Sequence, residues 1–377
     1  MHFACTQENL LHGLQIVSHL SGKNANLPVL GNVLIKTEAG ALRLSATNLE
    51  IAASCLVRGK VEAEGEYSVP AKLFLDYVSL LPNGKVELLL KEEGLEVRAG
   101  DQETVLRGMP ASEFPVLPKL AKPEGFLISS ADFRRMVSQV AFAVATSEQR
   151  PELMGVACFF GGIAGQGKAA FAATDAYRLA ERVVAYGGST AEGRYVVPAK
   201  AFAEAARIAG AYKDEMEAPE QVGLSFTESQ LVITFGNVEL VSRLIEAPFP
   251  DYRPLIPQQF KTEAVVPRSE LQKAVKAASL FSRQGIFDVH VSFEPDGTCT
   301  VQSADQGTGK TKTTIKAQVT GEANRMTLNY RFLGDGLASV DAAQVRIRQI
   351  DPMSPAVLLP EGSEEKYLYL LMPIRNA

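Results

Sequence analysis

The chain has 377 residues, of which 46% are hydrophobic and 21% are charged, and its formal net charge is −5. These values are typical of a globular protein with about two to three domains, and they exclude an intrinsically disordered chain. They also exclude a protein whose whole surface is positive, although a basic face on an acidic body is compatible with them.

The N-terminal segment has neither the charged start nor the apolar core of a signal peptide. The longest apolar run, from Tyr367 to Ile374, is too short to span a membrane, so we expect a cytoplasmic protein with no membrane partner. The histidines and cysteines form no CxxC motif and no pair at ligand spacing, which predicts no metal site and no cofactor. We expect reduced, mostly buried thiols at Cys5, Cys55, Cys158 and Cys299.

Three amphipathic segments occur along the chain, at residues 6–20, 130–144 and 267–282, and each predicts a helix. Thr6 and Ser130 are expected to cap the first two helices, and Pro267 to lie in the first turn of the third. The predicted buried faces contain Leu10, Leu14 and Val17 in the first helix, Phe133, Met136, Val137, Val140 and Val144 in the second, and Leu271, Val275 and Ala278 in the third.

The opposite faces of these helices carry polar or basic residues and no carboxylate directly opposite the apolar side. They hold His12, Gln15 and His19 in the first helix, Arg135 and Gln139 in the second, and Lys273, Lys276 and Arg283 in the third. A single face of this kind is most often simply solvated. Because three equivalent helices share it, we expect an anionic partner that is contacted through its phosphates, independently of sequence.

The helices belong to a longer repeat. Three corners of small residues with an Asn or Asp recur in order: SATNLE at 45–50, AATDAYR at 172–178 and SADQGTG at 303–309. A second helical pattern follows each corner, at 67–81, 195–209 and 327–340, and proline-rich phrases close the first two copies at 114–118 and 249–257. We predict three homologous domains, at about 1–120, 121–255 and 256–377, each with two helices and many strands.

Residues 304–311, ADQGTGKT, resemble a nucleotide-binding P-loop, except that Ala304 stands where the first glycine belongs. A working P-loop needs a helix directly after the glycines, so that backbone N–H groups converge on phosphate. Downstream of Lys310 the residues alternate in the pattern of a β-branched strand. The segment therefore predicts a hairpin, and a P-loop-like nucleotide site is kept as an alternative.

Several phrases, taken together and in order, resemble the bacterial replicative sliding clamp, the beta subunit of DNA polymerase III, over the whole chain. They are LPVLGNVLI at 27–35, VPAK at 69–72, ATDAYRLA at 173–180, FPDYRPLIP at 249–257 and MPIR at 372–375. The resemblance implies an α+β chain of three DNA-clamp domains and a head-to-tail homodimer that closes into a ring. Helices would line the hole around double-stranded DNA, and antiparallel sheets would form the outer rim.

The resemblance also implies a non-catalytic processivity factor that tethers its partners at the primer end. These are the catalytic subunit of DNA polymerase III, the clamp loader, repair polymerases and mismatch-repair proteins, which insert a short peptide with leucine and phenylalanine anchors into an apolar cleft. Carried over by motif, the cleft consists of Leu153, Thr174, Ala176, Tyr177, Arg178, Leu179, Pro250, Leu255, Phe332, Ser354, Pro355, Leu370, Met372, Pro373, Ile374 and Arg375.

The chain departs from the family pattern at several positions. Ala176 and Tyr177 replace the commoner Gly-His, Pro254 replaces an arginine, and Asn376 and Ala377 extend the tail. The DNA-binding candidates from the resemblance are Lys23, Asn24, Lys72, Gln149 and Arg150, and those from the helix faces are Arg135, Lys273 and Lys276. Besides the P-loop alternative, a scaffold that binds proteins but not DNA is also compatible with the repeats.

Overall fold

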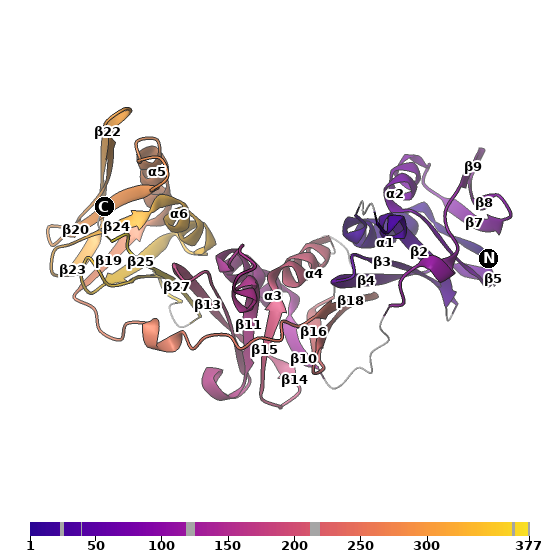
Figure 1. Cartoon of the computed structure of the whole chain (residues 1–377), viewed down its shortest axis with the longest axis horizontal. Coiled ribbons are helices and arrows are strands. Elements are labelled where there is room, and N and C mark those ends of the chain that lie inside the picture. Colours follow the sequence, from indigo (N-terminus) through magenta and orange to yellow (C-terminus); the bar gives the residue numbers. More distant parts are fainter. Residues whose placement is uncertain (23–25, 39, 118–124, 212–218, 364–365, 376–377) are drawn as a thin grey trace. The chain divides into compact units, whose positions relative to one another are not determined.

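The structure, a computed structural model, describes residues 1–22, 26–38, 40–117, 125–211, 219–363 and 366–375 (Figure 1). The chain forms two compact units. The first comprises Met1–Ala131, Gly187–Ser189 and Glu204–Leu244, and the second comprises Asp132–Tyr186, Thr190–Ala203 and Ile245–Ala377. The three domain boundaries expected from the sequence stay a prediction.

The described residues contain six α-helices, and the expectation of two helices in each repeat is confirmed. They are α1 (Gln7–Val17), α2 (Ala71–Leu80), α3 (Ser130–Val140), α4 (Ala199–Ala211), α5 (Arg268–Ser279) and α6 (Tyr330–Ser339). Thr6 caps α1 as expected, since its Oγ1 accepts from the Asn9 backbone N–H at 3.2 Å. The expected cap at Ser130 is wrong: this residue is the first of α3, and its hydroxyl donates to the Pro219 carbonyl. Pro267 precedes α5 rather than lying in its first turn.

Each repeat supplies one five-stranded and one four-stranded antiparallel layer. In the first repeat the five strands follow the order β5-β1-β7-β8-β9, and the other four follow β4-β3-β2-β6. Their bounds are β1 (His2–Thr6), β2 (Asn32–Glu38), β3 (Ala41–Thr47), β4 (Ile51–Val57), β5 (Lys60–Ala63), β6 (Glu66–Pro70), β7 (Lys85–Lys91), β8 (Gly94–Ala99) and β9 (Gln102–Leu106).

The second repeat has the same two layers, in the orders β14-β10-β16-β17-β18 and β15-β11-β12-β13. Its strands are β10 (Phe126–Ser129), β11 (Gly155–Phe160), β12 (Lys168–Thr174), β13 (Arg178–Ala185), β14 (Gly187–Gly188), β15 (Gly193–Pro198), β16 (Gln221–Phe226), β17 (Gln230–Phe235) and β18 (Val238–Arg243).

The third repeat gives the orders β23-β19-β25-β26-β27 and β22-β21-β20-β24. Its strands are β19 (Thr262–Pro267), β20 (Asp288–Glu294), β21 (Thr298–Asp305), β22 (Gly309–Lys316), β23 (Gln318–Gly321), β24 (Asn324–Asn329), β25 (Gln344–Gln349), β26 (Ala356–Pro360) and β27 (Tyr367–Leu371).

Consecutive repeats share sheets. In the first unit β4 pairs with β18, with Ile51 opposite Ser242, and this joins four strands of the first repeat to five of the second in one nine-stranded sheet. In the second unit β13 pairs with β27, with Arg178 opposite Leu371, and a second nine-stranded sheet forms in the same way. Within the described residues the two smaller sheets have β5 and β9, and β22 and β24, as their edge strands.

The helices pack their apolar faces inward, largely as predicted. Leu10, Leu14 and Val17 of α1 are fully buried, and the predicted residues of α3 and α5 are buried as well, except for half-buried Val144 beyond the end of α3. Gln15, His19, Arg135, Lys273 and Lys276 are exposed as predicted, whereas His12 is half-buried.

Two polar residues were assigned wrongly. Gln139 is buried, not exposed, because its amide is satisfied inside the second unit: Nε2 donates to the Ser339 carbonyl at 2.9 Å, and Oε1 accepts from Arg182 at 3.0 Å. Arg283 lies beyond the end of α5, where its guanidinium pairs with Asp288 at 2.5 Å and is not part of a basic helix face.

The segment 304–311 forms a β-hairpin, as the sequence predicts. β21 and β22 pair along their length, with Ala304 opposite Lys310 and Asp305 opposite Gly309. The Asp305 carboxylate closes the turn by accepting from the Gly307 and Thr308 backbone N–H groups at 2.9 and 3.0 Å. A strand rather than a helix follows the glycines, so the backbone geometry of a P-loop is not formed.

All four cysteines are free and buried, as expected. Burial raises the pKa of the Cys5, Cys55 and Cys299 thiols to about 12, which leaves them poorly reactive. In the part of the chain that the structure describes, no helix combines the length and the apolar character needed to cross a bilayer.

Gly336 allows α6 to pack closely on β27. A Cβ atom at this position would overlap the ring of Tyr369, whose hydroxyl donates to the Phe332 carbonyl at 2.9 Å and which is fully buried. Gly334 lies in the same helix, and a Cβ there would meet no atom within 4 Å. The two glycines therefore differ in packing although they share a helix.

We predict that Gly336→Ala lowers the free energy of unfolding by about 1–3 kcal/mol, because the added methyl group overfills the contact with Tyr369. Gly334→Ala is the matched control and should raise that free energy by about 0.5–1 kcal/mol, because alanine restricts the unfolded chain. Chemical denaturation followed by circular dichroism checks both values. Equal effects of the two substitutions would contradict the packing argument.

Candidate functional site

The corner between β12 and β13 is built by side chains that hydrogen-bond to their own backbone. Thr174 Oγ1 donates to the Arg178 carbonyl at 2.6 Å and accepts from the Ala176 N–H at 3.1 Å. The Asp175 carboxylate accepts from the Tyr177 and Arg178 N–H groups at 2.9 and 3.0 Å. These bonds hold Ala176 at a φ of 76° and leave the side chain of Tyr177 65% exposed.

The positive φ at position 176 makes alanine energetically less favourable there than glycine. A left-handed conformation costs a residue with a Cβ about 1–2 kcal/mol, and glycine avoids that cost. The corner's hydrogen bonds therefore have to offset a strain that glycine at this position would not impose.

Arg178 fixes the corner to the rest of the second unit. Its guanidinium donates to Asp175 at 2.9 Å, to Asp335 at 2.6 Å and to the Phe142 carbonyl at 2.9 Å. It also lies over the Phe332 ring, with its Cζ 4.5 Å from the ring centroid. Because all three donor nitrogens are engaged, Arg178 is a positioning residue, and Phe332 is placed beneath it.

The C-terminal segment runs beside the corner. Leu370 pairs with Leu179 in the β13–β27 ladder, and directly after β27 the Met372 N–H donates to the Tyr177 carbonyl at 2.9 Å. Two residues later the Ile374 N–H donates to the Thr327 carbonyl at 2.8 Å. These bonds hold the segment from Leu370 to Ile374 against the second unit, with Pro373 buried between them.

An apolar cluster lies at this junction. Its buried members are Ala172, Leu179, Tyr252 and Leu370, and the partly buried Phe159, Phe249, Ile256, Leu368 and Met372 pack against them. The Tyr252 hydroxyl donates to the Glu181 carboxylate, which satisfies the one polar atom of that ring. Burial, reinforced by the nearby Glu181 carboxylate, raises the pKa of Tyr252 well above its usual value, so the phenol stays neutral.

The structure brings most of the predicted cleft residues together. Thr174, Ala176, Tyr177, Arg178 and Leu179 form the corner, Phe332 lies under Arg178, and Leu370, Met372, Pro373, Ile374 and Arg375 belong to the C-terminal segment. Pro250 lies between Phe249 and Tyr252, and Leu255 follows with 57% of its side chain exposed. Ser354 and Pro355 lead into β26, whose Ala356 pairs with Leu371.

Leu153 is the predicted cleft residue whose contact with the others is not established. It is buried in the short 3-10 helix Pro151–Met154 before β11, and it is not a member of the cluster.

Sequence reasoning missed several residues of this site. Phe249, Tyr252 and Ile256 lie in the phrase FPDYRPLIP, from which only Pro250 and Leu255 were carried over. The signal that could have found them is the apolar and aromatic content of that phrase in a polar connector. Asp335 and Phe142 could not be found from the sequence, because they meet Arg178 only through the tertiary fold.

The predicted DNA-binding residues are scattered in the structure. Lys23 and Asn24 lie outside the described residues, whereas Lys72, Lys273, Lys276 and Gln149 are exposed. Arg135 is within 3.2 Å of Asp341, and Arg150 is within 3.0 Å of Glu152, so each already has a carboxylate beside it. Among these candidates, Lys72, Lys273 and Lys276 present the clearest positive charge.

A basic residue occupies the second position of the second helix in every repeat: Lys72 in α2, Lys200 in α4 and Arg331 in α6. All three side chains are exposed. A cation at a helix N-terminus opposes the helix dipole and costs about 0.3–1 kcal/mol, so helix stability does not account for this pattern. Sequence reasoning selected Lys72 and missed the other two, although the VPAK phrase repeats at 197–200.

Two helices with a four-stranded and a five-stranded antiparallel layer, repeated three times along one chain, define a DNA-clamp architecture. Family models of the DNA polymerase III beta subunit match all three copies: the N-terminal domain over residues 1–118, the central domain over 127–251 and the C-terminal domain over 253–375. The chain belongs to the DNA polymerase III beta subunit family and is a DNA sliding clamp of three clamp domains.

Individual relatives agree. The chain is 30% identical to the beta sliding clamp of Synechococcus elongatus over 381 residues, covering 100% of this chain and 99% of the relative. A crystal structure of the DNA polymerase sliding clamp from Bacillus subtilis superposes with a TM-score of 0.92 at 26% identity, covering 100% of both chains. The DNA polymerase III beta subunit from Pseudomonas aeruginosa gives a TM-score of 0.89 at 28% identity, also with 100% coverage of both.

Proposed function

We propose that two copies of this chain close head to tail into a ring around duplex DNA, with three domains per copy bounded near residues 120 and 255. The ring tethers the replicative polymerase and other DNA-processing proteins without breaking or making a covalent bond itself. The observation that carries this proposal is the repeated strand pairing, in which an edge strand of one repeat forms an antiparallel pair with a strand of the next repeat.

The pairing follows one rule inside the chain. The strand after the corner of one repeat pairs with the last strand of the next repeat: β4 with β18, and β13 with β27. β22 follows the corner of the third repeat, so by the same rule it should pair with the last strand of a following repeat. β9 is the last strand of the first repeat, so it should pair with the strand that follows the corner of a preceding repeat. A second copy supplies both, which makes each interface heterologous, and the ring closes when the second interface forms.

The side chains at these two edges support the pairing. Lys310 and Lys312 are exposed on β22, and neither takes part in an ion pair within the described residues. β9 carries the exposed carboxylate of Glu103, which also lies 3.2 Å from Arg98. Exposed apolar residues accompany both edges: Val105 lies on β9, and Leu280, which is 73% exposed, directly precedes Phe281, whose carbonyl accepts from Ser303 of β21 at 3.0 Å. A protein otherwise avoids leaving such edges open.

The corner and C-terminal segment of the second unit form the partner site in this proposal. Partners are the polymerase's catalytic subunit, a clamp loader, repair polymerases and mismatch-repair proteins, each of which inserts a short peptide with leucine and phenylalanine anchors. The exposed side chains of Tyr177 and Leu255, beside the cluster around Leu179 and Leu370, support capture of such anchors. Burying each anchor contributes about 1.5–3 kcal/mol.

DNA contacts in this proposal are few and directed at phosphates. Lys72, Lys200 and Arg331 at the helix starts, together with Lys273 and Lys276 of α5, supply exposed positive charge on a chain whose net charge is −5. Such contacts hold the duplex weakly and independently of sequence, so retention depends on closure of the ring.

For the ring, we predict a particle of about twice 40.6 kDa in solution. Once loaded on nicked circular DNA by a clamp loader, it should resist high salt and leave when the circle is cut. Lys310→Glu with Lys312→Glu should weaken the β22 edge, shift the particle toward 40.6 kDa and abolish retention on circles. Light scattering and gel filtration of the DNA complexes measure both properties.

The control for the ring carries the same charge change elsewhere: Lys168→Glu with Arg194→Glu, two exposed cations of the second unit. This variant should dimerise and stay on circles as the unchanged protein does. Retention on linear DNA with free ends would refute topological binding, and equal loss in both double variants would refute the role of the β22 edge.

For the DNA contacts, we predict that replacing Lys72, Lys200 and Arg331 by glutamine in one triple variant weakens binding to linear duplex DNA. The slope of log K against log salt should fall by about 0.9 for each phosphate contact removed. The control replaces Lys36 and Lys60, exposed lysines already paired with Glu66 and Glu62, and should leave the slope unchanged. Fluorescence anisotropy over a salt series decides between the two outcomes.

For the partner site, we predict that Leu255→Asp weakens binding of a synthetic leucine-phenylalanine peptide about tenfold or more and abolishes polymerase stimulation. The fold should survive because this side chain is largely exposed. Leu73→Asp, at an equally exposed leucine of α2, is the control and should bind the peptide normally. Calorimetry measures affinity, and a Leu255→Asp protein that still stimulates the polymerase would show that the site is misplaced.

A further inference from the structure

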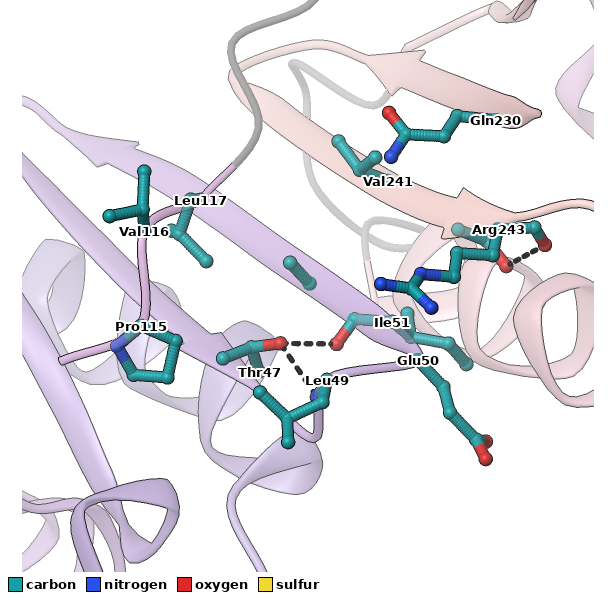
Figure 2. Close-up of a pocket in the computed structure, with 12 residues that line it drawn as sticks. Thr47, Leu49, Glu50, Ile51, Pro115, Val116, Leu117, Gln230, Val241 and Arg243 are labelled. Carbon is teal, nitrogen blue, oxygen red and sulfur yellow. Dashed lines mark hydrogen bonds between the residues drawn. The ribbon is translucent and has the colours of Figure 1, made fainter. Parts of the chain in front are cut away.

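A pocket of about 570 Å³ lies in the first unit, beside the β4–β18 pair (Figure 2). Ile51 and Val241 form its buried floor, Leu49 lies on one rim, and Val116 with Leu117 lies on another. The volume is in the range of pockets that bind small ligands and short peptide anchors. Neither the strand-pairing rule nor the partner site described above accounts for it.

The corner beside this pocket has the same four side-chain-to-backbone hydrogen bonds as the corner of the partner site. Thr47 Oγ1 donates to the Ile51 carbonyl at 2.9 Å and accepts from the Leu49 N–H at 3.0 Å, as Thr174 does with Arg178 and Ala176. Asn48 Oδ1 accepts from the N–H groups at positions 50 and 51, as Asp175 does at 177 and 178. Leu49 has a φ of 75° and Ala176 a φ of 76°.

The strand joint is repeated as well. The Arg243 N–H donates to the Glu50 carbonyl at 3.4 Å, in the place where the Met372 N–H donates to the Tyr177 carbonyl. The proline phrase also recurs, because Phe114 and Pro115 begin the connector here as Phe249 and Pro250 do there. The pocket therefore occupies, between repeats one and two, the position that the partner site occupies between repeats two and three.

The walls differ in chemistry at three aligned positions. Glu50 and Ile51 line this pocket where the partner site has Tyr177 and Arg178, and the third difference is at Arg243. Where the partner site has the thioether of Met372, this pocket has the guanidinium of Arg243, which is turned toward the pocket from the β18 side in Figure 2. The Arg243 side chain is exposed and makes no ion pair within the described part of the chain, and Glu50 points away from it. The apolar rim is open to a ligand, since Leu49 is 49% exposed and Val116 is 96% exposed.

We propose that this pocket docks a short extended segment of another protein that carries an apolar anchor next to a carboxylate. The anchor lies between Val116 and the floor at Ile51, and the carboxylate pairs with Arg243. The choice of a peptide as ligand rests on the proposed function of the partner site, whereas the requirement for an acidic group comes from Arg243 alone.

The experiment uses the full-length protein and a synthetic peptide with a leucine, a benzoylphenylalanine anchor and an adjacent aspartate. After irradiation, mass spectrometry maps the cross-links. We expect them both on the segment 115–117 or β18 and on the C-terminal segment 367–375. A peptide with lysine in place of aspartate should lose the first set of cross-links about fivefold while keeping the second.

Two variants test the pocket without disturbing the core. Arg243→Glu and Val116→Asp should each reduce cross-links at 115–117 and β18 about fivefold or more, and leave those at 367–375 unchanged. Arg194→Glu, which changes the net charge equally at an exposed arginine of β15, is the matched control and should change neither set.

The outcomes separate this proposal from that of the partner site. Cross-links at 367–375 alone, unaffected by Arg243→Glu, overturn the proposal for this pocket and leave the partner site intact. Cross-links at 115–117 or β18 that Leu255→Asp leaves unchanged, but Arg243→Glu removes, support the pocket even if the partner site fails. Equal labelling with the lysine peptide overturns the role of Arg243.

Discussion

Antiparallel pairing between successive repeats is the constraint on which the rest of this structure depends. Each repeat has a four-stranded layer that ends on the strand after its corner, and the five-stranded layer of the next repeat covers that strand. The backbone hydrogen bonds of β4 with β18 and of β13 with β27 satisfy groups that would otherwise be left at a sheet edge. The same requirement, applied to β9 and β22, is the physical reason for expecting a second copy of the chain.

The corners present exposed side chains beside the joints between repeats, and these are the places where we propose that partners bind. A Thr and an Asn or Asp hold the backbone in a tight turn with one residue at positive φ, and this places the next side chains beside the inter-repeat joint. In the second repeat Arg178 ties the turn to Asp335 and Phe142, next to the apolar cluster around Leu179 and Leu370. At the joint between the first and second repeats, Arg243 stands where Met372 stands at the next joint, and Glu50 stands where Tyr177 does.

The sequence predicted the helices and the hairpin of the repeats better than the positions of individual side chains. Two helices per repeat, their apolar faces and the hairpin at 304–311 follow from periodicity, from β-branched residues and from turn chemistry, all of which act over a few residues. Gln139 and Arg283 were assigned wrongly because their positions depend on partners from elsewhere in the fold, Ser339 and Arg182 for one and Asp288 for the other. Tyr252 and Phe249 were missed because a proline-rich connector does not reveal which of its residues pack inward.

The sequence by itself determined the threefold repeat, the helix faces and the family, because these are written in local spacing and in motifs that recur in order. Only the tertiary structure decided how the repeats share strands, since register between distant strands depends on hydrogen bonds that no local pattern specifies. Only the tertiary structure shows that the corners at 47–51 and 174–178 form the same hydrogen bonds although their amino-acid sequences differ. Their equivalence depends on backbone geometry, which Thr47 and Thr174 impose in the same way.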